Sequence, residues 1–259
     1  MSPMQNLSGL DQYFQSVYTN VQKCLNGPLN LAMIMSWIFQ NRLYFSQIMR
    51  TLVIHPEDLS TEFLTPIYAN LQDKTVMQGG ISKAEVQGLI ETHERVIMLG
   101  HGAPYGLLNP RRFPGAGLFI VDGSMVSTLK NKSSCIYIWC HAADFLKNYS
   151  LSGLCSGMFI SEVSEAEMYG FEDIGKYEID QSNQEFSSIL SRHINEPMDV
   201  LYSSLMTEYE AVAWVNPIAM FNFKRLQLIA EGIKYNPSHR LYPEYSMGTK
   251  AEDTKNGVC

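Results

Sequence analysis

Two side chains with the chemistry of acyl transfer stand directly after predicted strands. His101 lies two residues beyond the apolar run 95–99, and Cys140 immediately follows the run 135–139. Ligands of an open parallel sheet bind beyond the carboxyl ends of its strands, so both side chains would emerge there if the two strands are neighbours. The separation of 39 residues leaves room for a crossover and a loop. A thiol beside an imidazole is the minimum pair for thiol-dependent acyl transfer.

The backbone around these two residues could stabilise a developing negative charge. Glycine at position 102 leaves its N–H unobstructed, and the N–H of Cys140 lies at a predicted strand-to-helix turn. Two such donors would form an oxyanion hole, in which each donor contributes roughly 2.7–4 kcal/mol. The segment after Cys140 is predicted to be helical, so a helix N-terminus should also favour the thiolate.

The strings that contain these residues resemble the caspase-like, clan CD cysteine peptidases. RVIMLGHG ends an apolar strand in His-Gly and CIYIWCHA ends another in a cysteine. Caspases, metacaspases, gingipains, clostripain, legumain and separase share this order, and some uncharacterised bacterial proteins carry a similar His and Cys. The resemblance covers about residues 49–165. It implies a caspase-like α/β three-layer sandwich, with a mostly parallel central sheet and helices on both faces.

The same resemblance implies the roles of individual residues in a cysteine endopeptidase. His101 would be the base and acid, Cys140 the nucleophile, and the N–H groups of Gly102 and Cys140 the oxyanion donors. In this family, the position two before the nucleophile and the loop after the first strand often shape the primary substrate pocket. The first of these is Ile138, which carries no charge.

Several carboxylates could line that pocket. In the loop after the first strand, Glu57 or Asp58 could select a basic side chain, or either could be solvated. Asp122, in an Asp-Gly turn after the extended segment 117–121, is a further candidate. Glu162 and Glu165 could touch substrate, or form a solvated helix face.

Other interpretations of the same residues remain open. A His-Gly pair is common in turns, and a cysteine at a strand end is often a buried small hydrophobe. His101 and Cys140 could join His141 and Cys155 around a metal, but the spacing matches no known ligand pattern, so no metal is predicted. The loop 100–106 has the wrong spacing for a dinucleotide, so no cofactor is predicted either.

A second functional hypothesis is a catalytically silent caspase-like fold that acts as a sensing or scaffolding module. The uncharged residue at position 138 favours it, and so does the lack of a recognisable processing linker between subunits.

The elements that must position these residues alternate along the chain. Strands are expected at residues 51–54, 75–77, 95–99 and 135–139, with 117–121 as part of a hairpin or as a further strand. Ser60 is expected to cap one helix and Ser82, in a capping box with Glu85, another. Further helices are expected at 184–194 and 197–209. Short, uniformly apolar strands alternating with helices indicate a parallel sheet covered on both faces.

Three regions are predicted from these patterns. They are an N-terminal helical extension at 1–48, the α/β domain at 49–233 and a polar, flexible tail at 234–259. The most apolar stretch near the start, residues 31–39, is too short for a membrane span of about 20 residues. No integral membrane segment is therefore expected.

Composition narrows the class of protein further. A hydrophobic fraction of 46% supplies a core, which excludes wholesale disorder, and a net charge of −7 argues against a nucleic-acid partner. Five cysteines at irregular spacing, without a C-x-x-C pair, indicate reduced thiols and a cytoplasmic protein. The expected partner is a peptide or protein substrate, and the pattern does not indicate an oligomeric state.

Overall fold

The structure is a computed structural model that describes residues 49–132 and 134–230, together with the backbone of 233–235. The predicted helical extension at 1–48 lies outside the described residues, as does all of the predicted tail from residue 236 on.

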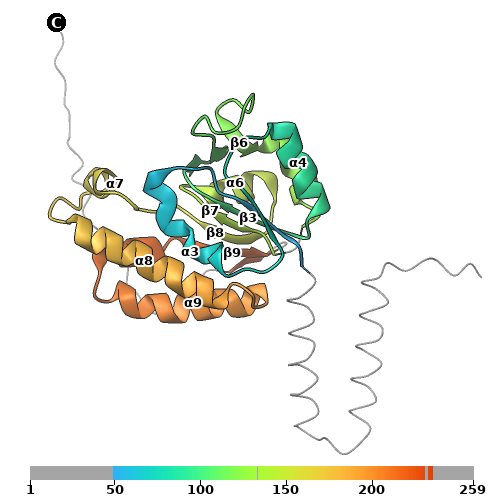
Figure 1. The fold of residues 1–259 in the computed structure, drawn as a ribbon. Coiled ribbons are helices and arrows are strands. Elements are labelled where there is room, and N and C mark those ends of the chain that lie inside the picture. Colours follow the sequence, from blue (N-terminus) through green and yellow to red (C-terminus); the bar gives the residue numbers. More distant parts are fainter. Residues whose placement is uncertain (1–48, 133, 231–232, 236–259) are drawn as a thin grey trace, which may run out of the picture. The chain divides into compact units, whose positions relative to one another are not determined.

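The described residues form a three-layer α/β sandwich, in which helices cover both faces of a mostly parallel sheet (Figure 1). This confirms the predicted fold class. The strands are β1 (Thr51–Ile54), β2 (Lys74–Met77), β3 (Arg95–Leu99), β4 (Gly102–Ala103), β5 (Gly106–Leu108), β6 (Phe119–Asp122), β7 (Ile136–Ile138), β8 (Gly153–Ser156), β9 (Leu226–Ala230) and β10 (Ile233–Tyr235). The helices are η1 (Leu59–Leu64), α3 (Pro66–Ala69), α4 (Lys83–Thr92), η2 (Gly123–Met125), α5 (Val126–Leu129), α6 (Ala142–Tyr149), α7 (Val163–Met168), α8 (Lys176–His193), α9 (Met198–Ala213) and α10 (Pro217–Phe223), where η denotes a 3-10 helix.

The central sheet has seven strands among the described residues, in the order β10-β9-β8-β7-β3-β1-β2. Strands β2, β1, β3, β7 and β8 are parallel to their neighbours in this list, β9 runs antiparallel to β8, and β10 runs antiparallel to β9. The strands that precede His101 and Cys140, β3 and β7, are therefore neighbours, as the candidate pair requires.

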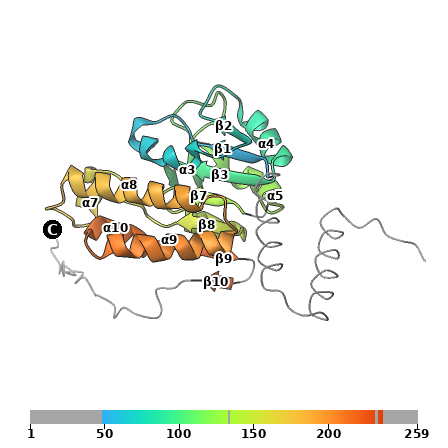
Figure 2. The ribbon, with the colours of Figure 1, turned by 60° about the horizontal axis from the view of Figure 1, so that its bottom comes forward.

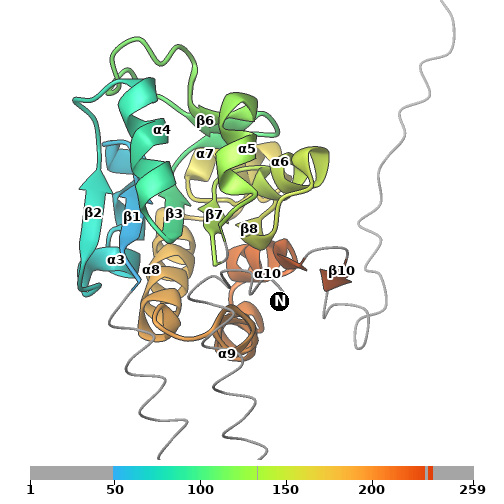
Figure 3. The same cartoon turned by 90° about the vertical axis from the view of Figure 1, so that its right-hand side faces the viewer.

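Apolar side chains on both faces of the strands hold the three layers together. In β1, Val53 belongs to the core cluster that includes residues of α3, α8, α9 and α10, whereas Leu52 and Ile54 belong to the cluster with α4, α5 and α6. Figures 2 and 3 show these two groups of helices on opposite sides of the sheet. A strand buried on both faces must be apolar at successive positions, which explains the unbroken runs in the sequence.

Two local predictions differ from the structure, at the first helix cap and at the end of the sheet, and a third is confirmed. The cap after β1 is Asp58, whose carboxylate accepts from the N–H of Ser60, and the chain first forms η1 rather than one continuous α-helix. The prediction that the extended segment at 117–121 belongs to a hairpin or a further strand is confirmed: β6 pairs with β5 in a small antiparallel sheet outside the central sheet. Strand β10 runs to Tyr235, so the central sheet continues past residue 233; pairing with β9 outweighs the polar composition of this segment.

Candidate active site

The pairing of β3 with β7 brings the predicted dyad together. Leu99 pairs with Ile138, and every pair in this ladder is offset by 39 residues. The ladder continues beyond the strand ends, because the N–H of Gly100 donates to the Ile138 carbonyl at 3.1 Å. The same offset then sets His101 opposite Cys140. Both residues line one small cavity of about 20 Å³, which has room for about one water molecule.

Gly102 is required by the ring that follows β7. A Cβ atom at position 102 would lie 2.0 Å from Cδ1 of Trp139, far inside van der Waals contact. The Trp139 ring is buried, and its Nε1–H donates to the Ala103 carbonyl at 3.2 Å. The Trp139 indole therefore fixes the position of the backbone at Gly102 and Ala103, directly after His101.

The N–H of Gly102 is directed away from its neighbouring strand. Gly102 pairs with Leu107 across β4 and β5, and the His101 carbonyl accepts from the N–H of Leu108 at 2.8 Å. This pattern makes Gly102 and Leu107 a non-hydrogen-bonded pair, whose N–H groups point outward from the ladder. The Gly102 N–H is thus available to a ligand.

The N–H of Cys140 has no acceptor on another described residue. Its two neighbours are both bonded: the N–H of Trp139 donates to Ser156 Oγ at 3.1 Å, and the N–H of His141 donates to the Gly157 carbonyl at 3.0 Å. The Cys140 N–H is within hydrogen-bond range of its own thiol. An oxyanion hole needs two amide donors that are free to bind a ligand, and the N–H groups of Gly102 and Cys140 are the candidates here.

The thiol of Cys140 is held away from the imidazole. Its Sγ lies 3.5 Å from the Phe159 carbonyl and 3.9 Å from Oε1 of Glu165, and no hydrogen bond joins it to His101 among the described residues. Burial, with a smaller contribution from the Glu165 carboxylate, raises the pKa of Cys140 to about 11. Burial therefore outweighs any stabilisation that the following helix, α6, gives to the thiolate.

The imidazole of His101 is held by a residue that the sequence pattern does not single out for the site. Its Nε2 lies 2.6 Å from Oγ of Ser60, and that hydroxyl lies 2.6 Å from Oδ1 of Asp58. Burial alone would raise the pKa of Asp58, but hydrogen bonds from Ser60 and the nearby His101 and Arg112 lower it below its usual value. The Asp-x-Ser spacing after the first strand is the only signal in the sequence.

The four predicted pocket residues have different surroundings. Glu57 contacts Arg112 at 3.4 Å and its side chain is 66% exposed, whereas Asp58 lines a 220 Å³ cavity together with His101. Ile138 is only 2% exposed; it packs in the core and lines the small cavity at Cys140. Asp122 pairs with Lys83 and lines neither of the cavities that contain His101.

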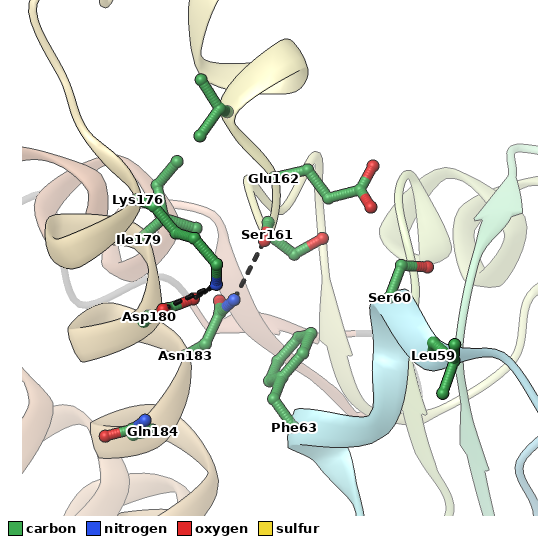
Figure 4. Close-up of a pocket in the computed structure, with 11 residues that line it drawn as sticks. Leu59, Ser60, Phe63, Ser161, Glu162, Lys176, Ile179, Asp180, Asn183 and Gln184 are labelled. Carbon is green, nitrogen blue, oxygen red and sulfur yellow. Dashed lines mark hydrogen bonds and ion pairs between the residues drawn. The ribbon is translucent and has the colours of Figure 1, made fainter.

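A third cavity, of about 310 Å³, lies between η1, the loop before α7 and the first turns of α8 (Figure 4). It shares Phe63 and Ser161 with the small cavity at Cys140, so the two are adjacent. Lys176 neutralises Asp180 at 2.7 Å, while the carboxylate of Glu162 forms no ion pair among the described residues. The cavity therefore has one unbalanced negative charge.

Of the two glutamates before and within α7, only Glu162 lines this cavity. Glu165 turns back instead, and its Oε2 accepts from the N–H groups of Ser161 and Glu162 at 2.8 and 3.2 Å. Glu165 thereby caps α7, and it places a negative charge close to the thiol of Cys140.

The chain was compared with family models, curated proteins and solved structures, and none of them matches it. No helix in the described ranges has the length and apolar character to cross a membrane. Within the same ranges, no group of three or more His, Cys, Asp or Glu side chains is arranged to hold a metal ion.

Proposed function

We propose that this protein is a cysteine peptidase in which Cys140 is the nucleophile and His101 the general base and acid. The observation that carries the proposal is a thiol and an imidazole that follow neighbouring strands and line one cavity. The N–H groups of Gly102 and Cys140, which bond to no other described residue, supply the candidate oxyanion donors. Such donors stabilise the oxyanion of acyl transfer more than the ground-state carbonyl. The resemblance to caspase-like peptidases supports the same assignment.

The reaction follows from these roles. As Sγ of Cys140 bonds to the substrate carbonyl carbon, His101 takes the thiol proton and the carbonyl oxygen becomes an oxyanion between the two N–H groups. Collapse of this intermediate breaks the C–N bond, and His101 gives its proton to the departing amine. The product is a thioester. Water, deprotonated by His101, then releases the acid and restores the thiol.

The surroundings of the thiol determine how the attack begins. With its pKa raised to about 11, the thiol of Cys140 is protonated at neutral pH. His101 must therefore act as a general base during the attack instead of meeting a preformed thiolate. The Sγ–H must also leave the Phe159 carbonyl and turn toward the imidazole before the attack.

The substrate is a peptide or protein segment whose side chain enters the 310 Å³ cavity next to the dyad. Apolar walls at Phe63 and Ile179, with the unpaired carboxylate of Glu162, suit a side chain with a hydrocarbon stem. The free thiols of Cys135, Cys140 and Cys155 support a reducing, cytoplasmic setting. The net charge of −7 argues against a nucleic-acid substrate.

One observation favours a second candidate, the catalytically silent sensing or scaffolding module. The resting thiol donates to the Phe159 carbonyl and not to His101, so the dyad is not assembled for attack. In that case the cavities would bind a peptide without cleaving it.

A peptide-library cleavage assay separates the two candidates. The parent and C155A, which removes a buried thiol away from the cavities, are expected to cleave, whereas C140A and H101A lose cleavage by about 100-fold or more. Mass spectrometry of a stalled reaction should find the acyl group on Cys140. A folded parent protein that binds library peptides but cleaves none of them would contradict the peptidase and support the module.

A further inference from the structure

A chain of two short hydrogen bonds connects the loop after β1 to the imidazole. Oδ1 of Asp58 lies 2.6 Å from Oγ of Ser60, and this Oγ lies 2.6 Å from Nε2 of His101. Ser60 and His101 are 41 residues apart in the sequence, so the tertiary fold makes this contact. Asp58 is also the N-cap of η1, which fixes both its carboxylate and the Ser60 hydroxyl.

The protons in this chain can be assigned by elimination. A carboxylate is only an acceptor, so the single hydroxyl proton of Ser60 is directed to Asp58. The lone pair of Ser60 Oγ then faces Nε2, and a hydrogen bond there requires Nε2 to be the donor. A neutral imidazole with its proton on Nε2 has its lone pair on Nδ1. That atom accepts no hydrogen bond from any described residue.

We propose that Asp58 and Ser60 are a positioning pair, which holds His101 in the Nε2–H tautomer and leaves Nδ1 as the atom that takes the proton of Cys140. The catalytic use of this pair rests on the proposed peptidase function, but the tautomer itself does not. Neither residue touches the reacting atoms. Asp58 thus serves the imidazole as well as lining the 220 Å³ cavity, where the sequence predicts a substrate-pocket role.

The charges around the imidazole fit this role. The groups that face His101 are the carboxylate of Asp58, from the loop after β1, and the thiol of Cys140, from the end of β7. The charge of Arg112 also lowers the pKa of Asp58, with a smaller effect than that of His101. When His101 becomes an imidazolium during the attack, the ionised carboxylate of Asp58 stabilises it through the hydrogen-bonded hydroxyl of Ser60.

Substitutions at the two positions test the hydroxyl of Ser60 and the charge of Asp58 independently. S60A removes the acceptor for Nε2–H, while S60T keeps a hydroxyl and should restore it. D58N keeps the side-chain oxygen that caps η1, since Asn and Asp are equally good N-caps, but removes the charge. S82A is the matched control, because Ser82 also bonds a carboxylate and caps a helix, at 2.7 Å from Glu85, without contacting a histidine.

The first measurement needs no substrate. Two-dimensional ¹H–¹⁵N NMR of the full chain, with H101Q to assign the signals, reports which ring nitrogen carries the proton. We expect the Nε2–H tautomer in the parent, S82A and S60T, and a mixture of tautomers in S60A. A parent ring protonated at Nδ1, or an unchanged ring in S60A, overturns the positioning pair whether or not the protein is a peptidase.

The second measurement uses cleavage. S60A should lower kcat by about 10- to 100-fold, because the general base loses its positioning, and S60T should restore kcat. Because Ser60 also lines the 310 Å³ cavity, the rescue by S60T, and not KM, is the readout that identifies the positioning role. D58N should lower kcat in the same direction, since the imidazolium formed during the attack loses its carboxylate. An active parent whose kcat is unchanged in both S60A and D58N overturns the pair and leaves the peptidase intact. Labelling of Ser60 by a fluorophosphonate would also overturn it, by making Ser60 the nucleophile.

Discussion

Removing the charge of Glu165 should make the Cys140 thiol more reactive. Oε1 of this carboxylate lies 3.9 Å from Sγ, and both its charge and its contact with the thiol favour the protonated form. E165Q keeps an oxygen that can accept from the N–H groups of Ser161 and Glu162, so α7 should retain its cap.

The size of the effect follows from Coulomb's law and the burial of the thiol. Two unit charges about 4 Å apart interact by about 1 kcal/mol in water and about 4 kcal/mol at an effective dielectric constant of 20. Since Glu165 is partly exposed, we take the lower end, which is a fall of roughly one unit in the pKa of Cys140 from its value of about 11. The thiolate fraction at pH 7.5 then rises about tenfold, from about 3 in 10,000.

A less basic thiolate is also a weaker nucleophile. With a Brønsted coefficient of about 0.4–0.5, a fall of one pKa unit lowers the reactivity of each thiolate about threefold. The net increase in alkylation rate at pH 7.5 is therefore about threefold.

Iodoacetamide labelling followed by peptide mass spectrometry measures this rate for each cysteine. Cys140 should label fastest among the described thiols, because Cys135 and Cys155 are fully buried, and the pKa of Cys155 is raised to about 12 by burial. E178Q is the matched control: Glu178 likewise accepts from the N–H of Gly175 at the start of α8, and it bonds to no thiol among the described residues. If the pH–rate curve of alkylation is unchanged in E165Q, or if E178Q increases the rate equally, the Glu165 charge does not raise the pKa of Cys140. Either result would refute the reasoning.

Three further predictions follow from other contacts. G102A should lower stability by about 1–3 kcal/mol in thermal denaturation, because the added Cβ would overlap the Trp139 ring; an unchanged Tm would contradict this packing. E162Q should reduce kcat/KM selectively for peptides with a basic side chain in the 310 Å³ cavity, and equal losses for neutral peptides would show that its charge is not used. Burial lowers the pKa of His55 from 6.5 to about 4. Between these pH values the unfolded chain binds more protons than the folded protein, so stability falls as the pH drops from about 6.5 to 4. The loss is roughly 3 kcal/mol at most. H55Q should flatten this part of a stability–pH curve measured by urea unfolding, and a parent curve that is already flat there would refute the prediction.

Local patterns were sufficient to predict the elements that position the site. Strands β1 and β3 match the expected runs residue for residue, and β2 and β7 match within a residue or two. The capping box of Ser82 and Glu85 is confirmed, because both of its hydrogen bonds join residues three apart in the sequence. Parallel pairing of strands buried on both faces then defines the sheet edge at which His101 and Cys140 emerge.

Local patterns were not sufficient for the hydrogen-bond partners of the site. Whether Asp58 or Ser60 caps the first helix is a choice between two good N-caps, and the fold decides it by using the Ser60 hydroxyl at His101. The 310 Å³ cavity likewise joins η1 to α8, elements more than 100 residues apart in the sequence.

The sequence by itself determined which residues end the strands, because side-chain periodicity and capping act over a few neighbouring residues. Only the tertiary structure decided the protonation of Cys140, since burial among Phe159 and other distant groups sets the cost of charging the thiol. It also decided the partner of His101. Desolvation and hydrogen bonding depend on which distant segments fill the space around a polar atom, and no short stretch of sequence contains that information.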